Sequence, residues 1–409
     1  MAQTSEKHPA GRIPAVHPPT ITDQAALEQL CQRLQQAPQI GIDTEFVSED
    51  TFHPELCLIQ IATAEELAVV DTMAVKDLKP FWDLLTQGDH VTIFHAGREE
   101  LNFVLRAVDA VPRQMFDVQL ASGFCCQEFP SAYGAIVRKY LNHKPRKGEQ
   151  RTDWRRRPLT DAQIDYALED VRYLLPLYEH LTETLSQSDR LDWFQDELER
   201  WRDEVIAARQ RKDWRRVSGI GSLSPRSLAI VRELWLWRQQ EAERLNKPPK
   251  RLLRDDLLVE AAKRKSDKPE QLMAIRGMQR GPMKQLAEEM AACVRRGLKA
   301  PVERMPKSTR TRTVSQLNLL GQFLTPALAT ICQRSNIAAS LVGTATDVRE
   351  LIAFRLDLPE AKEKGPPKLS RGWRAEVVGN LINELLDGKK SIRIVNANHE
   401  DPLVFDGVS

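Results

Sequence analysis

Short apolar runs alternate with amphipathic segments in the first half of the chain. Four runs are bounded by polar residues, glycine or proline, as is typical of β-strands: QIGIDTEFV, LCLIQIA, ELAVVD and VTIFHA. Helical periodicity follows in DQAALEQLCQRLQQA and EELNFVLRAV, and it is strong from Leu159 to Leu185. This alternation of strand and helix signals predicts an α/β layer domain over residues 21–205.

The pattern changes after about residue 217, where strand signals stop. Three amphipathic segments follow, and Ser224 before Pro225 marks the first as a helix with an N-cap and a proline in its first turn. These segments predict a small helical domain over residues 218–298. The rest is predicted to form a basic linker, a second helical domain and a tail, at residues 299–313, 314–395 and 396–409.

Composition limits the class of protein. Of the 409 residues, 42% are hydrophobic and 28% are charged, which is the range of globular proteins, and no apolar run is long enough to predict a membrane span. Residues 1–20 contain several prolines and lack an apolar segment, so a disordered leader is predicted rather than a secretory signal. Six scattered cysteines without a CxxC pair favour a reducing compartment, so a cytoplasmic location is predicted.

The distribution of charge is more informative than the net charge of +2. Any one basic cluster is most simply interpreted as a solvated helix end or linker. Four clusters, two of them with an embedded tryptophan, favour a phosphate-backbone partner. They lie at residues 144–157, 209–216, 247–254 and 295–312.

Asp43 and Glu45 lie one residue apart within an otherwise apolar strand. Side chains alternate along a strand, so these two point to one face and Thr44 points to the other. Like charges on one face raise each other's pKa unless a cation lies between them, and oxygen ligands suit Mg²⁺ or Mn²⁺. Such pairs are also common on exposed edge strands, so the pattern alone leaves a metal site and a solvated pair open.

Two later segments add candidate groups. Glu99 and Glu100 fall in the first turn of a predicted helix, where acidic side chains also compensate the helix dipole. Thr160 begins a capping box, and Tyr166 and Asp170 lie one turn apart on the helix that it starts. A tyrosine hydroxyl there would place a water beside a metal held by the aspartate; the alternative is an ordinary amphipathic helix with polar surface residues.

Taken together, these segments resemble the ribonuclease D family of the DEDD exonuclease superfamily. The resemblance covers about residues 35–185 and rests on IDTEFV, PELCLIQIA, FHAGREEL, FDVQLA and RTDWRRRPLTDAQIDYALEDVRYLLPLY. Residues 218–298 resemble the helicase-and-RNase-D C-terminal (HRDC) domain, and GWRAEVVGNLINELLDGKKSIRI resembles a second, diverged copy. The resemblance implies an α/β RNase H-like exonuclease domain followed by two small all-α, HRDC-like domains.

The same resemblance implies a metal-dependent 3′–5′ exoribonuclease that uses two divalent cations, Mg²⁺ or Mn²⁺, and releases nucleoside 5′-monophosphates. The expected substrate is RNA with a single-stranded 3′ end, with precursor tRNA as the family's substrate class. No membrane and no protein partner are expected. Two alternatives stay open: a catalytically weak or inactive RNA-binding protein that keeps the fold, and a DNA 3′–5′ exonuclease.

The family's motif positions map onto this chain residue by residue. The implied metal ligands are carboxylates from three motifs: Asp43, Glu45, Glu100 and Asp170. Tyr166 is the implied catalytic tyrosine, which orients the attacking water. The family has aspartate where this chain has Glu100, and this departure bears on the geometry of the second cation.

Four further residues lie close to these motifs. Asp117, in FDVQLA, is expected to support the site rather than to replace a ligand. His95, Arg151 and Trp154 are the expected substrate contacts. The alternatives are core packing for His95 and, for the other two, an ordered loop held by an Arg–Asp pair.

Overall fold

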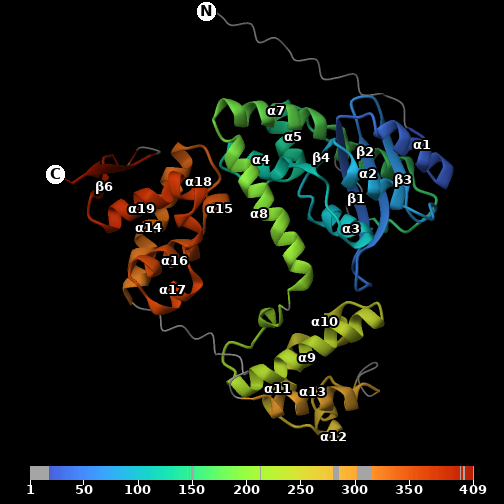
Figure 1. The fold of residues 1–409 in the computed structure, drawn as a ribbon. Coiled ribbons are helices and arrows are strands. Elements are labelled where there is room, and N and C mark those ends of the chain that lie inside the picture. The colour runs from blue at the N-terminus through green and yellow to red at the C-terminus, as the bar shows by residue number, and fades with distance from the viewer. Residues whose placement is uncertain are drawn as a thin grey trace, which may run out of the picture.

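The computed structural model describes residues 18–146, 148, 152–211, 213–279, 285–301, 315–396, 398 and 401–408. Within these residues an α/β domain is followed by two mostly helical domains (Figure 1). Most of the predicted leader, most of the predicted linker and Arg151 lie outside the described residues. In the part of the chain that is described, no helix has the length and apolar character needed to cross a bilayer.

The α/β domain is built on a five-stranded sheet with the order β3-β2-β1-β4-β5. β2 is antiparallel to β1 and β3, whereas β4 is parallel to β1 and β5. The strands are β1 (Gln39–Val47), β2 (Glu55–Ala62), β3 (Leu67–Asp71), β4 (Val91–Phe94) and β5 (Gln114–Asp117). The first four correspond to the predicted strands. β5 was missed because its sequence, QMFD, is too short to show a pattern.

Helices cover the two faces of this sheet. Buried residues of α1, α2 and α3 pack on one face around Ile40, Ile42 and Ile59. Buried residues of α4, α5, α6 and α7 pack on the other face around Leu58 and Val69. The helices of the domain are α1 (Gln24–Leu34), α2 (Lys79–Gln87), α3 (Arg98–Val108), α4 (Val118–Cys125), α5 (Tyr133–Leu141), α6 (Asp161–Arg172), α7 (Leu174–Gln187) and α8 (Leu191–Gln210).

The helical periodicity from Leu159 to Leu185 is divided between two helices. α6 ends at Arg172 and α7 begins at Leu174, with Tyr173 between them at φ −104° and ψ 5°. Pro176 lies in the first turn of α7, and a proline clashes with the carbonyl four residues before it and has no N–H to donate. The break therefore falls where the proline requires it, directly after the segment that carries Asp170.

The first helical domain has its own core, which includes Trp237, Leu258 and Met290. The predicted N-cap is confirmed, since the Ser224 side chain accepts a hydrogen bond from the backbone N–H of Ser227. Its elements are η1 (Trp214–Arg216), α9 (Pro225–Arg244), α10 (Pro249–Leu252), α11 (Asp255–Arg264), α12 (Pro269–Met273) and α13 (Ala287–Lys299).

The second helical domain is not all-α. Residues predicted as a tail supply β7 (Leu403–Gly407), which pairs antiparallel with β6 (Lys390–Ile394). Two short strands with mixed polar and apolar residues gave no clear signal in the sequence. The helices are α14 (Ser315–Arg334), α15 (Ala339–Val342), α16 (Ala345–Arg355), α17 (Pro359–Lys364), η4 (Lys368–Ser370), α18 (Gly372–Arg374), the π-helical turn η5 (Ala375–Gly379) and α19 (Asn380–Leu386).

The second helical domain shares a hydrophobic core with the α/β domain. The Trp373 ring lies 4.9 Å from that of Phe124 in α4 and stacks at 6.0 Å on that of Trp193 in α8, measured between ring centroids. Arg374, only 1% exposed, donates two hydrogen bonds of 2.6 Å to the carboxylate of Glu197 in α8. A buried bidentate pair of this kind holds one relative orientation.

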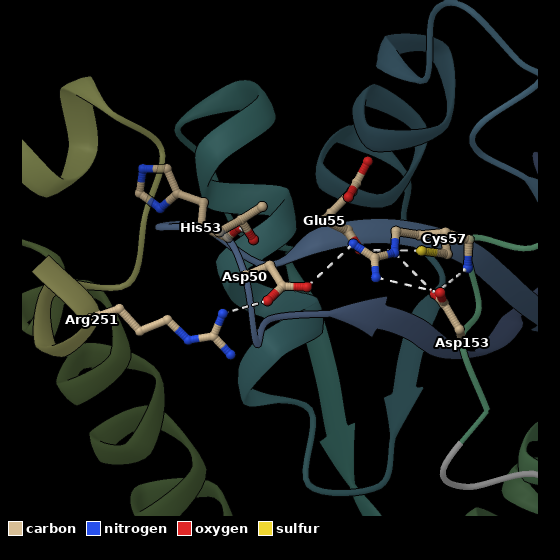
Figure 2. A network of polar contacts seen from close by, with 8 residues as sticks. Asp50, His53, Glu55, Cys57, Asp153 and Arg251 are labelled. Atoms are coloured by element: carbon tan, nitrogen blue, oxygen red, sulfur yellow. Dashed lines mark hydrogen bonds and ion pairs between the residues drawn. The ribbon is translucent and has the colours of Figure 1, made fainter. Parts of the chain in front are cut away.

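The first helical domain meets the α/β domain through polar contacts (Figure 2) and through Phe52, which packs against its core. Asp50, in the loop between β1 and β2, accepts a 2.6 Å hydrogen bond from Arg251 in α10. Its other oxygen lies 3.6 Å from Arg155, which also pairs with Asp153 in the loop before α6. His53 lies 3.5 Å from Glu243 in α9. One exposed carboxylate thus joins three segments: the loop after β1, the loop before α6, and the first helical domain.

We expect these two attachments to differ in stability. Glu197→Gln leaves Arg374 buried without its counter-charge, and breaking a buried pair costs about 3–5 kcal/mol. Asp50→Asn makes the same chemical change at a solvent-exposed site, where ion pairs contribute little. Differential scanning calorimetry is expected to show a large fall in melting temperature for Glu197→Gln and a small one for Asp50→Asn. Equal falls would contradict this interpretation.

Candidate active site

Three carboxylates from two elements meet on one face of the sheet. Asp43 and Glu45 of β1 point toward α6, which carries Asp170. One carboxylate oxygen from each of the three residues lies within 4.8 Å of the other two. β1 supplies the spacing because side chains two residues apart share a face. The structure therefore brings together three of the four predicted ligands.

α6 positions Asp170 because its start and its buried face are both fixed. Thr160 and Gln163 form the predicted capping box, with each side chain bonded to the other's backbone N–H. Leu168 and Val171 are buried against the sheet. Asp170 consequently faces β1, and Tyr166 lies one turn earlier on the same helix.

Glu100 comes to the same site from the N-terminal turn of α3. It is 5% exposed, and its Oε1 accepts a 2.5 Å hydrogen bond from the Thr44 hydroxyl. Glu100 is not one of the three clustered carboxylates, but it lies close enough for its charge to act on both Asp43 and Glu45. Glu99, the other acidic residue of this turn, instead accepts a hydrogen bond from Asn102.

Asp117 supports the turn that presents Glu100. Its Oδ2 accepts from the Gly97 N–H and its Oδ1 accepts from the Leu120 N–H, both at 2.9 Å. The start of α3 is thereby tied to the start of α4. A side chain at Gly97 would come within 2.5 Å of the Phe94 ring, so only glycine fits this turn. The predicted supporting role of Asp117 agrees with these contacts.

The site concentrates negative charge in a partly desolvated space. Burial is the largest cause of each shift: it raises the pKa of Glu45 to about 8, of Glu100 to about 7 and of Asp170 to about 6. The pKa of Asp43 is raised well above its usual range by burial and then by the charges of Glu100, Asp170 and Glu45. Burial and mutual repulsion both oppose ionisation, so the charged form of this cluster needs a cation.

The three residues predicted to contact substrate differ in their surroundings. Trp154 is 2% exposed and lies 6.1 Å from the Tyr166 ring, so this burial argues against a direct contact with substrate. The Arg–Asp pair that holds its loop uses Arg155 and Asp153 at 2.9 Å. The Nε2 atom of His95 lies 2.9 Å from the carbonyl oxygen of Ser131. A substrate contact by His95 stays a prediction, and Arg151 is outside the described residues.

Tyr133 of α5 was not predicted from the sequence. Its hydroxyl accepts a 3.0 Å hydrogen bond from the Tyr173 N–H, at the break between α6 and α7. Its ring makes an edge contact with His95, with centroids 5.5 Å apart. Tyr133 thus fixes the end of the helix that carries Asp170. A single tyrosine in a helical segment carries no sequence signal for this role.

Two protein families match the chain. Residues 18–186 match the family described as 3′-5′ exonuclease, and residues 227–294 match the HRDC domain. The first match contains every clustered carboxylate. The second lies within the first helical domain.

Individual proteins match along almost the whole chain. The ribonuclease D of Nitrobacter hamburgensis is 32% identical, over 91% of this chain and 96% of its own. That of Gluconacetobacter diazotrophicus is 33% identical, over 91% and 93%. The crystal structure of Escherichia coli RNase D, described as an exoribonuclease involved in structured RNA processing, is 26% identical with a TM-score of 0.76, covering 90% of this chain and 98% of that one.

We expect the metal-free protein to lose stability as the pH rises. Carboxyl groups with raised pKa values hold more protons in the folded chain than in the unfolded one between about pH 4 and about pH 8, so the free energy of unfolding falls across that range. Divalent cations compete with these protons, so they are expected to raise the melting temperature more at about pH 8 than at about pH 6.

Thermal melting in chelator and in added Mg²⁺ or Mn²⁺, across this pH range, measures both effects. Asp170→Asn removes one titrating group and is expected to flatten the metal-free profile. A metal-free melting temperature that rises between about pH 6 and about pH 8 would contradict the sign of this linkage.

Proposed function

The chain belongs to the ribonuclease D family and is a 3′–5′ exoribonuclease, and we propose that it uses two divalent cations to trim single-stranded 3′ ends of precursor tRNA. The observation that carries the metal-dependent mechanism is the cluster of Asp43, Glu45 and Asp170, whose oxygens lie within 4.8 Å of one another. Hard oxygen ligands in such a cluster suit Mg²⁺ or Mn²⁺.

The residues present fit these cations. The cluster is partly desolvated, and the groups that act on Asp43 are carboxylates, so bound cations would offset a repulsion that the fold otherwise maintains. Asp43, central to the cluster, would be shared between the two cations. Glu45 and Asp170 would complete one of them, and Glu100 would hold the other.

The cations, when bound, lower the pKa of the attacking water and stabilise charge on the leaving 3′-oxygen. The chain's own residues do the positioning. Tyr166 lies one turn before Asp170 on α6 and would orient the attacking water. The Trp154 ring lies beside that of Tyr166, with centroids 6.1 Å apart. Holding reacting groups in place supplies a large share of the rate in such reactions.

The domain arrangement supports RNA with a structured body as the substrate. Escherichia coli RNase D is described as acting in structured RNA processing. In the first helical domain, four basic side chains and Glu233, which pairs with two of them, line a pocket between α9 and α13; the basic residues are Arg232, Arg295, Arg296 and Lys299. This domain also contacts the loop that follows β1 through Asp50. We propose that it holds phosphate groups of the RNA body while a single-stranded 3′ end reaches the carboxylates.

We also propose a cytoplasmic location. The six cysteines are free thiols and all are buried. Burial raises the pKa of Cys31, Cys57 and Cys293 to about 11, which keeps these thiols protonated and unreactive. Protected free thiols of this kind suit a reducing compartment.

The decisive experiment uses a tRNA with a single-stranded 3′ extension, labelled at its 5′ end. We expect stepwise shortening and release of nucleoside 5′-monophosphates with Mg²⁺ or Mn²⁺, and none in excess chelator. Asp43→Asn is expected to abolish cleavage, because it removes a charge that both cations need. Undiminished shortening in excess chelator would reject the metal mechanism. Faster degradation of a DNA strand of the same sequence would instead favour a DNA exonuclease.

A second test concerns Glu100, which replaces the family's aspartate. The extra methylene adds about 1.5 Å of reach, and in the structure it allows Glu100 to bond to Thr44. We expect Glu100→Gln to raise the Mg²⁺ concentration needed for half-maximal cleavage, because a ligand charge is lost. Glu100→Asp, which restores the family's residue, is expected to stay active.

Glu99→Gln is the matched control, because Glu99 lies in the same helical turn but contacts Asn102. It is expected to behave like the wild type. If Glu100→Gln matches the wild type at every Mg²⁺ and Mn²⁺ concentration, Glu100 is not a ligand and the second cation must be held differently.

A further inference from the structure

One fully buried amide in the sheet has no partner. Gln60, in the middle of β2, is 0% exposed, and neither its Oε1 nor its Nε2 has a hydrogen-bond partner among the described residues. An amide can make up to four hydrogen bonds, and leaving its groups unpaired in the interior costs about 1–3 kcal/mol each. Stability alone would favour an apolar residue here.

The position of Gln60 relates it to the carboxylates. In the antiparallel pairing of β1 and β2, Gln60 lies directly opposite Asp43. Its neighbours Leu58 and Ala62 belong to the core beneath α6, whereas Ile59 and Ile61 belong to the opposite face. Gln60 therefore points to the same face as Asp43, and Cβ atoms of directly opposed residues are about 4.5–5.5 Å apart.

The ligand role proposed for Asp43 would give the amide of Gln60 a hydrogen-bond partner. Carboxylates that hold metal ions are usually hydrogen-bonded by a further residue, which fixes their orientation. An amide N–H gives a carboxylate such a bond without adding another negative charge to the site. An arginine or lysine in this place would bring its own charge next to the cations.

We propose that Gln60 is a positioning residue whose Nε2–H donates to the carboxylate of Asp43 when that carboxylate holds cations. This inference rests on the proposed metal-dependent function. It implies that the chain retains an amide that disfavours the metal-free fold because the amide orients the central ligand of the site.

The test separates metal binding from folding. Gln60→Met keeps the length of the side chain and removes both amide atoms. The matched control is Thr92→Val in β4. Thr92 is also 0% exposed with an unpaired hydroxyl, but it pairs with Ile40 and so lies on the opposite face of the sheet.

Melting temperature is measured first in chelator and then as a function of Mn²⁺ and Mg²⁺ concentration, with cleavage of a tailed RNA as a second readout. Gln60→Met is expected to melt at or above the wild-type temperature in chelator. It is also expected to need roughly 10–100-fold more cation for half-maximal stabilisation. Thr92→Val is expected to respond to cations like the wild type.

Two results would overturn the proposal. A Gln60→Met protein with the wild-type cation response would show that the amide does not act on Asp43. A Gln60→Met protein that melts far lower in chelator would show that the amide has a structural partner in the fold. If the wild type itself shows no response to cations, the proposed metal site fails, and that outcome is distinct from both.

Discussion

The confinement of four carboxylates at one end of the central strand is the constraint on which the rest of the structure depends. Like charges in a poorly solvated space repel one another, so the fold must hold them together against an electrostatic cost. Each carboxylate is therefore carried by a strand or helix that contacts elsewhere in the domain hold in place. β1 carries Asp43 and Glu45 in the middle of the sheet, α6 is fixed at its start by a capping box, and α3 is tied through Asp117 to the next helix. Because these elements are rigid, the carboxylates keep their relative positions before cations bind.

The same constraint explains features that stability would not favour. Thr44 points away from the cluster, yet its hydroxyl holds Glu100, the one ligand candidate that differs from the family. The bond satisfies one oxygen of a buried carboxylate, and the charge of that carboxylate still acts on Asp43. A buried acidic side chain that lowers stability is expected at a functional site, where its chemistry is needed.

Local signals predicted the parts of the site that depend on local geometry. The capping box at Thr160 and the shared face of Asp43 and Glu45 follow from short-range periodicity, and the structure shows both. Two other features were missed. The break at Tyr173 follows from Pro176, which the apolar periodicity conceals, and the burial of Trp154 in the core of the α/β domain has no local pattern. The pairing of β6 with β7 depends on a partner that neither strand specifies alone.

The two helical domains are physically different parts of the molecule. The second is fused to the α/β domain by a common core, and Arg374 is bonded in the interior to Glu197 of α8. Removing it would expose Phe124 and Trp193, so it belongs to the framework that supports the catalytic domain. The first has a separate core and meets the α/β domain through the packing of Phe52 and through exposed charges around Asp50, which solvent and salt weaken. A charged partner that competes for the same arginines would weaken this attachment. An RNA backbone is such a competitor, and Asp50 lies in the loop that leads directly from the strand of Asp43 and Glu45.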